Sequence, residues 1–251
     1  MELQNAGLDF EDMQGTCFAN GIDWTIMEDD FWMIGGLHHS GKTTLTLLAS
    51  GLLRPSFGRA LLQGVDVIEG SDREYRRARE ETAVVFEQGG RLFQQATIFD
   101  NVAMPLRYQG AMGEPEIEER TLALLDMVGL HPKRNTTPSM ISRNLQQRAA
   151  LARSLALCPD LIFFDNCLAG LDGREKSWWR ETILHLHQGH PLLNDKPAAI
   201  VVTTADLDHW RFPDLKFALI DASGFTTYEN IKEMLETCPS HLKELLHPRG
   251  N

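Results

Sequence analysis

Short runs of consecutive apolar residues recur along the chain, and each is followed by a polar loop or a helical pattern. These runs are FWMI at 31–34, TAVVF at 82–86, LIFF at 161–164 and AAIVV at 198–202. A strand that is buried on both faces has a continuous apolar run, whereas a half-buried strand alternates. The runs therefore predict a parallel sheet in an α/β fold. The opening segment and ALLQGVDVI at 60–68 are shorter and more polar, which predicts an antiparallel β edge region.

The strand pattern stops between about 91 and 157. The segment EPEIEERTLALLDMVGL has acids and Pro115 at its start, ends at Gly129 and places apolar residues on one face, which predicts a helix. A second helical segment, LQQRAALARSLAL, follows a loop rich in Pro, Thr, Asn and Ser. We expect a helical lobe at about 91–157, inserted into one domain that spans 1–251. The rest of that domain is a core at about 1–90 and 158–227 and a helical tail at about 228–251.

Trp178 and Trp179 stand next to each other in REKSWWRETILHL, which has a helical pattern. Two interpretations are open. The pair could form a surface for a partner protein, since aromatic residues are enriched at interfaces. Alternatively, at least one of the two could pack against the sheet.

The balance of charges limits the classes of partner. The chain has 251 residues, a net charge of -11 and an isoelectric point near 5.3. Such a field repels nucleic acids and anionic membrane surfaces, so any phosphate group must be held by a local site. The four cysteines form no CxxC pair, which predicts neither a disulfide framework nor a zinc site. No apolar run approaches about 18 residues, and the first residues lack a signal-peptide pattern, so we expect a cytoplasmic protein.

The strongest local motif is GLHHSGKT at 36–43, which fits GxxxxGK followed by Thr. It follows an apolar strand and precedes a helical pattern, the context in which such a loop binds phosphate. Gly36 and Gly41 allow a tight turn that aims backbone N–H groups at one point, beside a helix N-terminus. Lys42 would reach the β and γ phosphates, and the Thr43 hydroxyl would bind Mg²⁺. The candidate nucleotide-binding residues are Gly36, Leu37, His38, His39, Ser40, Gly41, Lys42, Thr43 and Thr44.

A second part of the site is expected at the end of another strand. LIFF is followed directly by Asp165, so a buried strand would deliver a carboxylate to its C-terminal end. Such an acid holds the water shell of Mg²⁺ in phosphate-binding ATPases. An acid after four apolar residues is weak evidence by itself, but together with the loop it predicts a Mg-nucleotide site.

These motifs, with further segments, resemble the nucleotide-binding subunit of an ABC transporter over nearly the whole chain. VVFEQGGRLFQQATIFDNVAMPLR at 84–107 resembles the glutamine loop, with Gln88 as the residue that senses Mg²⁺ and with Glu87 in a place that usually holds an aromatic or apolar residue. ISRNLQQRAALAR at 141–153 resembles the signature segment and its helix. AGLD at 169–172 resembles the loop that signals across the dimer. Residues 84–107 are most similar to the ATPases of MCE-associated, Mla-type lipid transport systems.

The resemblance implies a P-loop NTPase fold of the RecA-like type and ATP with Mg²⁺ as cofactors. Thr43, Gln88 and Asp165 would be the Mg²⁺ ligands. It also implies a head-to-tail dimer, either a homodimer or a heterodimer with another ABC ATPase, and separate integral membrane permease subunits. The protein would lie on the inner face of the cell membrane and bind no nucleic acid. Phe10 and Phe18 are both candidates for the aromatic residue that stacks on adenine.

Three departures from the family pattern fall on its chemistry, and no catalytic residue is intact. Asn166 stands at the general-base position, where a glutamate is expected. Ala205 stands at the switch-histidine position, although a shift of one residue would place Thr204 there. Side chains replace the glycines of the signature segment, which here reads Ser142, Arg143 and Asn144.

An amide orients water but accepts no proton, and loss of a general base typically costs about 10²- to 10⁴-fold in rate. The sequence therefore predicts an ATP-binding subunit for lipid or other hydrophobic cargo, with slow or absent hydrolysis. The alternative is a catalytically silent structural or regulatory partner of an active ABC ATPase. An ABC protein that acts on nucleic acid is disfavoured by the acidic charge.

Overall fold

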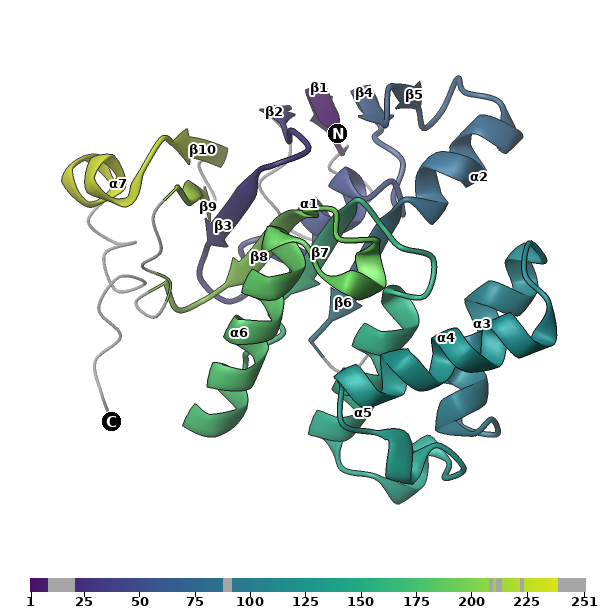
Figure 1. Ribbon diagram of the computed structural model, residues 1–251. Coiled ribbons are helices and arrows are strands. Elements are labelled where there is room, and N and C mark those ends of the chain that lie inside the picture. Colours follow the sequence, from purple (N-terminus) through teal and green to yellow (C-terminus); the bar gives the residue numbers. More distant parts are fainter. Residues whose placement is uncertain (9–20, 88–91, 208–209, 211–213, 222–223, 239–251) are drawn as a thin grey trace.

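The computed structural model describes residues 1–8, 21–87, 92–207, 210, 214–221 and 224–238 (Figure 1). At its centre is a six-stranded sheet of order β10-β9-β3-β8-β7-β6. Its strands are β3 (Phe31–Gly35), β6 (Thr82–Phe86), β7 (Leu161–Asp165), β8 (Ala199–Thr204), β9 (Lys216–Asp221) and β10 (Gly224–Tyr228). All neighbours are parallel except β9 and β10. The four apolar runs form β3, β6, β7 and β8, so the predicted parallel sheet is confirmed.

Burial on both faces explains why these strands are continuously apolar. Every residue of β3, β7 and β8 is buried. Successive residues of β7 enter different cores: Phe163 packs on the side of α1 (Lys42–Ala49), and Phe164 packs on the side of the other helices. Side chains of a strand alternate between the faces of a sheet. Both faces are therefore covered, and neither requires polar residues.

The predicted antiparallel edge region is a second sheet of order β2-β1-β4-β5. Its strands are β1 (Glu2–Gly7), β2 (Ile22–Thr25), β4 (Phe57–Leu62) and β5 (Val65–Asp66), and all of their pairings are antiparallel. The buried side chains of Trp24 and Leu62 pack in one cluster with Ile34 of β3 and Leu45 of α1. This core joins the small sheet to the large one.

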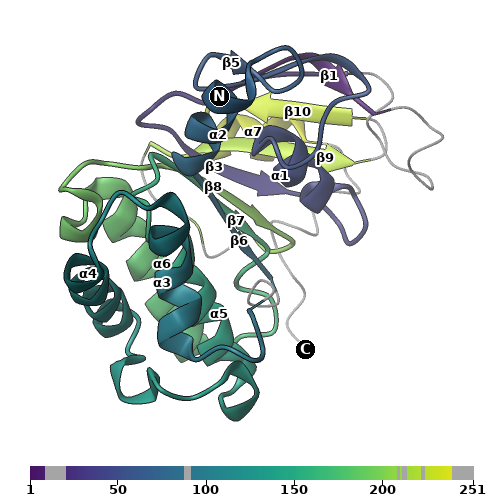
Figure 2. The same ribbon diagram turned by 90° about the vertical axis from the view of Figure 1, so that its right-hand side faces the viewer.

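Helices fill the stretch for which the sequence predicts an inserted lobe. Between β6 and β7 the chain forms α3 (Ile98–Gln109), α4 (Glu114–Met127) and α5 (Arg143–Ser154), with short 3-10 turns at His131–Lys133 and Pro138–Met140. Figure 2 shows α3, α4, α5 and α6 (Gly173–Gln188) on one side of the large sheet and α1 on the other. α2 (Asp72–Glu80) lies beside the small sheet. Within the described residues, no helix has both the length and the hydropathy that crossing a membrane requires.

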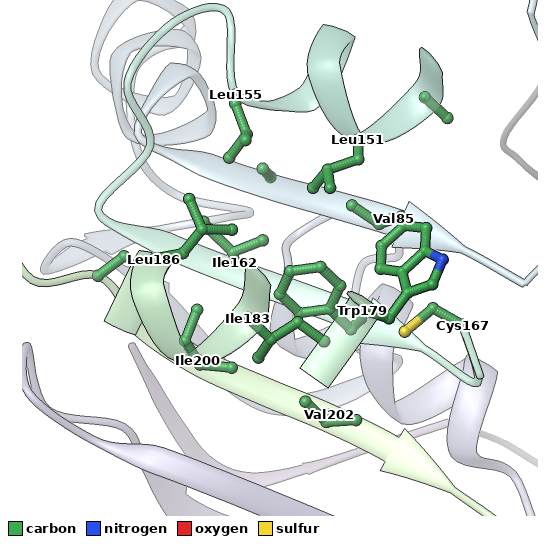
Figure 3. Close-up of a cluster of buried hydrophobic side chains, with 14 of the residues drawn as sticks. Val85, Leu151, Leu155, Ile162, Cys167, Trp179, Ile183, Leu186, Ile200 and Val202 are labelled. Atoms are coloured by element: carbon green, nitrogen blue, oxygen red, sulfur yellow. The ribbon is translucent and has the colours of Figure 1, made fainter. Parts of the chain in front are cut away.

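One face of the large sheet is sealed by α5 and α6 (Figure 3). Trp179 of α6 is fully buried, and its ring centroid lies 6.3 Å from that of Phe164 in an edge-to-face arrangement. Trp178 lies against the Arg148 guanidinium of α5, with 3.8 Å between Cζ and the ring centroid. The expectation that at least one tryptophan packs against the sheet is confirmed for Trp179. The other residues of this cluster that Figure 3 labels are Val85, Leu151, Leu155, Ile162, Cys167, Ile183, Leu186, Ile200 and Val202.

The predicted helical tail is described in part. α7 (Ile231–Thr237) begins after Asn230, whose side chain accepts a hydrogen bond from the Glu233 N–H. Residues 239–251 lie outside the described part of the chain. The division into core, lobe and tail stays a prediction.

Candidate nucleotide-binding site

The loop between β3 and α1 has a backbone that requires glycine. A Cβ atom on Gly36 would lie 2.3 Å from Ser40 Oγ and 2.7 Å from the Ile220 carbonyl oxygen, so a larger residue cannot fit. Gly41 precedes α1 with a φ of 96°, in the left-handed region that favours glycine. His39 also has a positive φ, of 62°. The loop therefore turns tightly and leads into the N-terminus of α1, whose unpaired N–H groups favour an anion.

Lys42 folds back over this loop. Its Nζ donates hydrogen bonds of 2.7 Å to the carbonyl oxygens of Gly36 and Leu37. The side chain is buried, and burial lowers the pKa of Lys42, while the negative charges of Asp165 and Glu87 act in the opposite direction. A desolvated ammonium group beside a helix N-terminus is suited to hold a phosphate.

Asp165 closes the site from the end of β7. Its Oδ2 accepts a hydrogen bond of 2.8 Å from Thr43 Oγ1, and its Oδ1 accepts one of 2.9 Å from Thr203 Oγ1. Burial raises the pKa of Asp165, although the hydrogen bonds from both threonines oppose this effect. A hydroxyl and a carboxylate are hard oxygen ligands, so Thr43 and Asp165 fit Mg²⁺.

Two adjoining cavities surround these groups. The first is about 460 Å³ and is lined by residues 38–44, Glu87, Asp165 and Asn166. The second is about 400 Å³ and shares His38, Glu87 and Asn166 with the first. Thr204 and Ala205 both line the second cavity, so both alternatives for the switch position lie beside Asn166. The structure thus brings together the loop, the acid and the residues predicted to stand at the two altered catalytic positions.

Glu87 is a site residue that the sequence reasoning did not place there. Its Oε2 accepts a hydrogen bond of 2.9 Å from Asn166 Nδ2. One signal in the sequence could have found it, because Glu87 directly follows the apolar run of β6 as Asp165 ends that of β7. Polar residues at the C-terminal ends of neighbouring parallel strands lie at the same edge of the sheet.

The signature residues do not line either cavity. Ser142 is the N-cap of α5, and its Oγ accepts a hydrogen bond from the Leu145 N–H. Ser142 thus caps the helix that follows it. Arg143 is exposed on the first turn of α5, and Asn144 is half-buried beside it.

Three further candidates, Gln88, Phe10 and Phe18, lie outside the described residues. The roles assigned to them from the sequence stay predictions.

The sequence profile of the family described as ABC transporter matches residues 19–169, which is more than half of the chain. The chain belongs to the ABC transporter family. This confirms the resemblance at the level of the family. The narrower similarity to Mla-type ATPases stays a prediction.

Individual members of the family differ in what they transport. This ABC family chain is 39% identical over 151 residues to the methionine import ATP-binding protein MetN 1 of Rhodopseudomonas palustris, which covers 60% of this chain and 40% of that protein. It is 42% identical over 132 residues to the intermembrane phospholipid transport system ATP-binding protein MlaF of Haemophilus influenzae, which covers 53% of this chain and 50% of that protein. The chain spans less than two thirds of the length of these curated relatives.

The fold is that of ABC ATPase cassettes. A dimeric structure of the ATP-binding cassette MJ0796, in a post-hydrolysis state with bound ADP and Pi, matches with a TM-score of 0.76 and 26% identity. That match covers 92% of this chain and 99% of the other. The predicted α/β fold of a P-loop NTPase is therefore confirmed.

Proposed function

We propose that this chain is the ATP-binding subunit of an ABC transporter and that it binds Mg-ATP on residues 36–44. One observation carries the proposal: the buried Lys42 and the hydrogen-bonded pair of Thr43 and Asp165 meet in a single cavity. That arrangement supplies a cation for phosphate and two oxygen ligands for Mg²⁺. The net charge of -11 gives no general attraction for anions, so the loop at 36–44 has to supply the affinity for ATP.

Residues 36–44 and Asp165 would contact different parts of Mg-ATP. N–H groups of the loop and of the first turn of α1 would donate to the phosphates, and the helix dipole would add a partial positive charge. Lys42 Nζ would release its hydrogen bonds to the carbonyl oxygens of Gly36 and Leu37 and donate to the β and γ phosphates instead. Thr43 and Asp165, with Gln88, would hold Mg²⁺, which neutralises charge on the phosphates.

We infer slow or absent hydrolysis from the altered positions. Asn166 offers an amide where a proton acceptor is required, and neither Ala205 nor Thr204 offers an imidazole. In the dimer implied by the family, Arg143 and Asn144 would meet the nucleotide held by the partner chain. Their side chains would obstruct the close backbone approach that glycines allow.

The proposed setting is a sandwich dimer attached to separate permease subunits on the cytoplasmic face of the membrane. The dimer is either a homodimer or a heterodimer with another ABC ATPase. We propose lipid or another hydrophobic compound as the cargo, which is supported by the similarity of residues 84–107 to Mla-type ATPases. One of the relatives is named for phospholipid transport, and another is named for methionine import. These names leave several kinds of cargo to test.

A second candidate function is a silent structural or regulatory partner of an active ABC ATPase. Asn166 favours this function, because its amide would impair hydrolysis of the ATP that is bound to the chain's own loop. Arg143 and Asn144 would impair hydrolysis of the ATP that is bound to its partner. Both defects occur in one chain, so a homodimer would contain two doubly impaired sites.

Titration with a fluorescent ATP analogue in the presence of Mg²⁺ tests the proposal. The Lys42→Ala variant should bind at least about 10-fold more weakly, because a charge-assisted hydrogen bond contributes about 1.5–3 kcal/mol. Lys133→Ala is the matched control, since that lysine is exposed in a 3-10 turn away from both cavities. A wild-type chain that binds no ATP would refute the proposal. Turnover of several per second that Lys42→Ala abolishes would refute slow hydrolysis.

A further inference from the structure

The register of the central sheet places two residues side by side at its carboxyl edge. Phe86 of β6 pairs with Asp165 of β7 in parallel register. The next residues, Glu87 and Asn166, therefore leave the sheet together, and their side chains are joined by the hydrogen bond of 2.9 Å. A carboxylate thus lies beside the amide that occupies the general-base position.

Glu87 differs from the other carboxylate of the same cavity. Asp165 is 3% exposed, and each of its oxygens accepts a hydrogen bond from a threonine. Glu87 is exposed, and its Oε2 accepts the hydrogen bond from Asn166. Glu87 lines the same cavity as Lys42 and Asp165, so it lies close to the charged centre of the site. Among the described residues, no side chain donates a hydrogen bond to Oε1 of Glu87, and this is the oxygen that we assign to a water molecule.

Asn166 holds this carboxylate in place. The Asn166 N–H lies 3.1 Å from both the carbonyl oxygen and the Oγ1 of Thr203, and it donates to them. Its φ of 51° turns the chain sharply at the end of β7. These bonds hold the backbone of Asn166 against β8, and from there its Nδ2 donates to Glu87. The amide accepts no proton, but it orients a group that does.

We propose that Glu87 is the catalytic base of this chain, positioned by Asn166, for the slow hydrolysis of ATP; the inference rests on the proposed ATP binding. Glu87 accepts a proton from water while the water oxygen bonds to the γ phosphorus. The bond from that phosphorus to the β,γ-bridging oxygen breaks, and its electron pair remains on ADP. The carboxylate then releases the proton to solvent. A positioned base of this kind contributes about 10²- to 10⁴-fold.

The test compares Glu87→Gln with the wild type and with a matched control. Glutamine keeps an oxygen that accepts from Asn166, but it has no carboxylate to take a proton. Glu118→Gln is the control, since Glu118 is exposed on α4 outside both cavities. Hydrolysis is followed in single turnover, with the full-length protein in excess over radiolabelled ATP. Affinity for a non-hydrolysable ATP analogue is measured separately, once with Mg²⁺ and once with EDTA.

We expect Glu87→Gln to lower the single-turnover rate by at least about 100-fold. Its affinity for the analogue should be unchanged or higher, because a negative charge beside the phosphates is removed. Glu118→Gln should match the wild type in both measurements. Asn166→Ala should lower the rate less than Glu87→Gln and leave the affinity unchanged, as expected for a positioning residue.

Three results would overturn the inference. The first is a Glu87→Gln variant that hydrolyses ATP at the wild-type rate. The second is a Glu87→Gln variant whose affinity for the ATP analogue no longer depends on Mg²⁺, since this would make Glu87 a metal ligand. The third is a wild type that binds the analogue but hydrolyses no ATP, which would leave the proposed binding function intact. A wild type that does not bind the analogue would instead refute the proposed function itself.

Discussion

Thr43 Oγ1 donates a hydrogen bond of 2.8 Å to Asp165 Oδ2. The two residues are 122 positions apart in the chain, and they join the start of α1 to the end of β7. This bond brings the glycine-containing loop and the carboxyl edge of the sheet into one site. The same two oxygen groups are the proposed ligands of Mg²⁺.

The Thr43→Ala variant should lose most of the effect of Mg²⁺ on ATP affinity. Removing the hydroxyl removes one metal ligand and one hydrogen bond to Asp165, a change worth about 1–2 kcal/mol, or roughly 10-fold in affinity. The measurement is the ratio of ATP dissociation constants with Mg²⁺ and with EDTA. Thr43→Ser keeps the hydroxyl and should keep the ratio. An unchanged ratio in Thr43→Ala would show that this hydroxyl does not bind the metal.

Asn166→Glu alone should raise the ATPase rate by less than about 10-fold. In the proposed function Ala205, Arg143 and Asn144 stay altered, so the switch position would still lack an imidazole and the signature segment would still be obstructed. The new carboxylate would also lie beside that of Glu87, and like charges this close oppose ionisation of both groups. Steady-state phosphate release is the measurement, with Asn166→Gln as the uncharged control. Turnover of several per second in Asn166→Glu would show that the other positions are not limiting.

The Asp30 carboxylate should make the stability of the chain depend on pH. Its Oδ2 accepts hydrogen bonds from the Met27 N–H and from Trp32 Nε1, and its Oδ1 accepts from Lys216 Nζ. Burial alone would raise the pKa of Asp30, but these hydrogen bonds outweigh burial and hold the pKa below its usual value. The stabilisation is therefore present above about pH 4, the pKa in the unfolded chain, and is lost as the pH falls through the folded pKa.

Asp30→Asn tests this effect by urea unfolding at several pH values. The variant should be less stable than the wild type by about 1–3 kcal/mol near neutral pH, and the difference should shrink below about pH 4. Asp29→Asn, a change at the exposed neighbouring residue, is the control and should show no such trend. A difference that stays constant down to about pH 3 would contradict the assignment.

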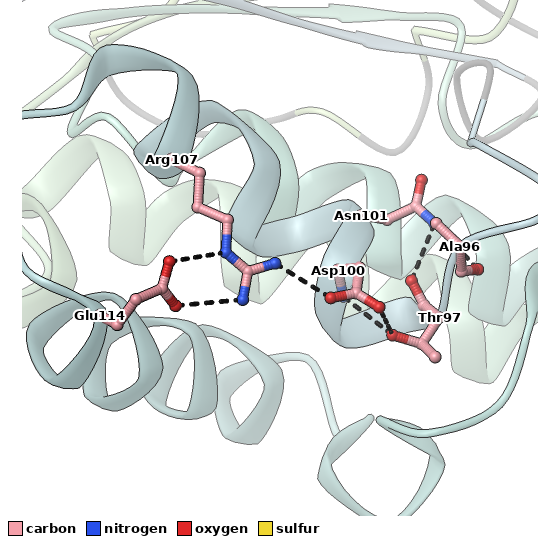
Figure 4. Close-up of polar contacts among 6 residues, drawn as sticks. All are labelled: Ala96, Thr97, Asp100, Asn101, Arg107 and Glu114. Carbon is pink, nitrogen blue, oxygen red and sulfur yellow. Dashed lines mark hydrogen bonds and ion pairs between the residues drawn. The ribbon is translucent and has the colours of Figure 1, made fainter.

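Asn101 should contribute more to stability than the two ion pairs that Arg107 of α3 forms near it (Figure 4). Asn101 is fully buried; its Oδ1 accepts from the Phe93 N–H at 2.7 Å, and its Nδ2 donates to the Thr97 carbonyl oxygen at 2.9 Å. Arg107 pairs with Asp100 and Glu114 in partly exposed positions. Asn101→Ala should cost about 1–3 kcal/mol because buried partners lose their hydrogen bonds.

Arg107→Ala is the comparison for Asn101→Ala, and it should cost less than about 1 kcal/mol, since exposed ion pairs are screened by water. Urea unfolding of both variants measures the difference. Equal losses of unfolding free energy in the two variants would mean that the Arg107 ion pairs stabilise the fold as much as the buried Asn101 amide does.

The tight turn of the loop at 36–43 was predictable from the sequence because its geometry is local. Gly36, Gly41, Lys42 and Thr43 are neighbours in the chain, and the turn that they form depends on short-range backbone conformations. The continuous apolar runs were equally informative, because strands covered on both faces leave no polar positions. Asp165 could be placed at a strand end for the same reason. Gln88, outside the described residues, stays a prediction.

The sequence alone determined the fold class, the tight loop at 36–43 and the placement of Asp165 at a strand end, since each follows from a short stretch of residues. Only the tertiary structure decided which carboxylate lies next to Asn166. Glu87 is 79 positions away from it, and they meet because β6 and β7 are neighbours in one parallel register. Strand order and register depend on packing across the whole sheet. No short-range pattern specifies them, so this contact became visible only in the folded chain.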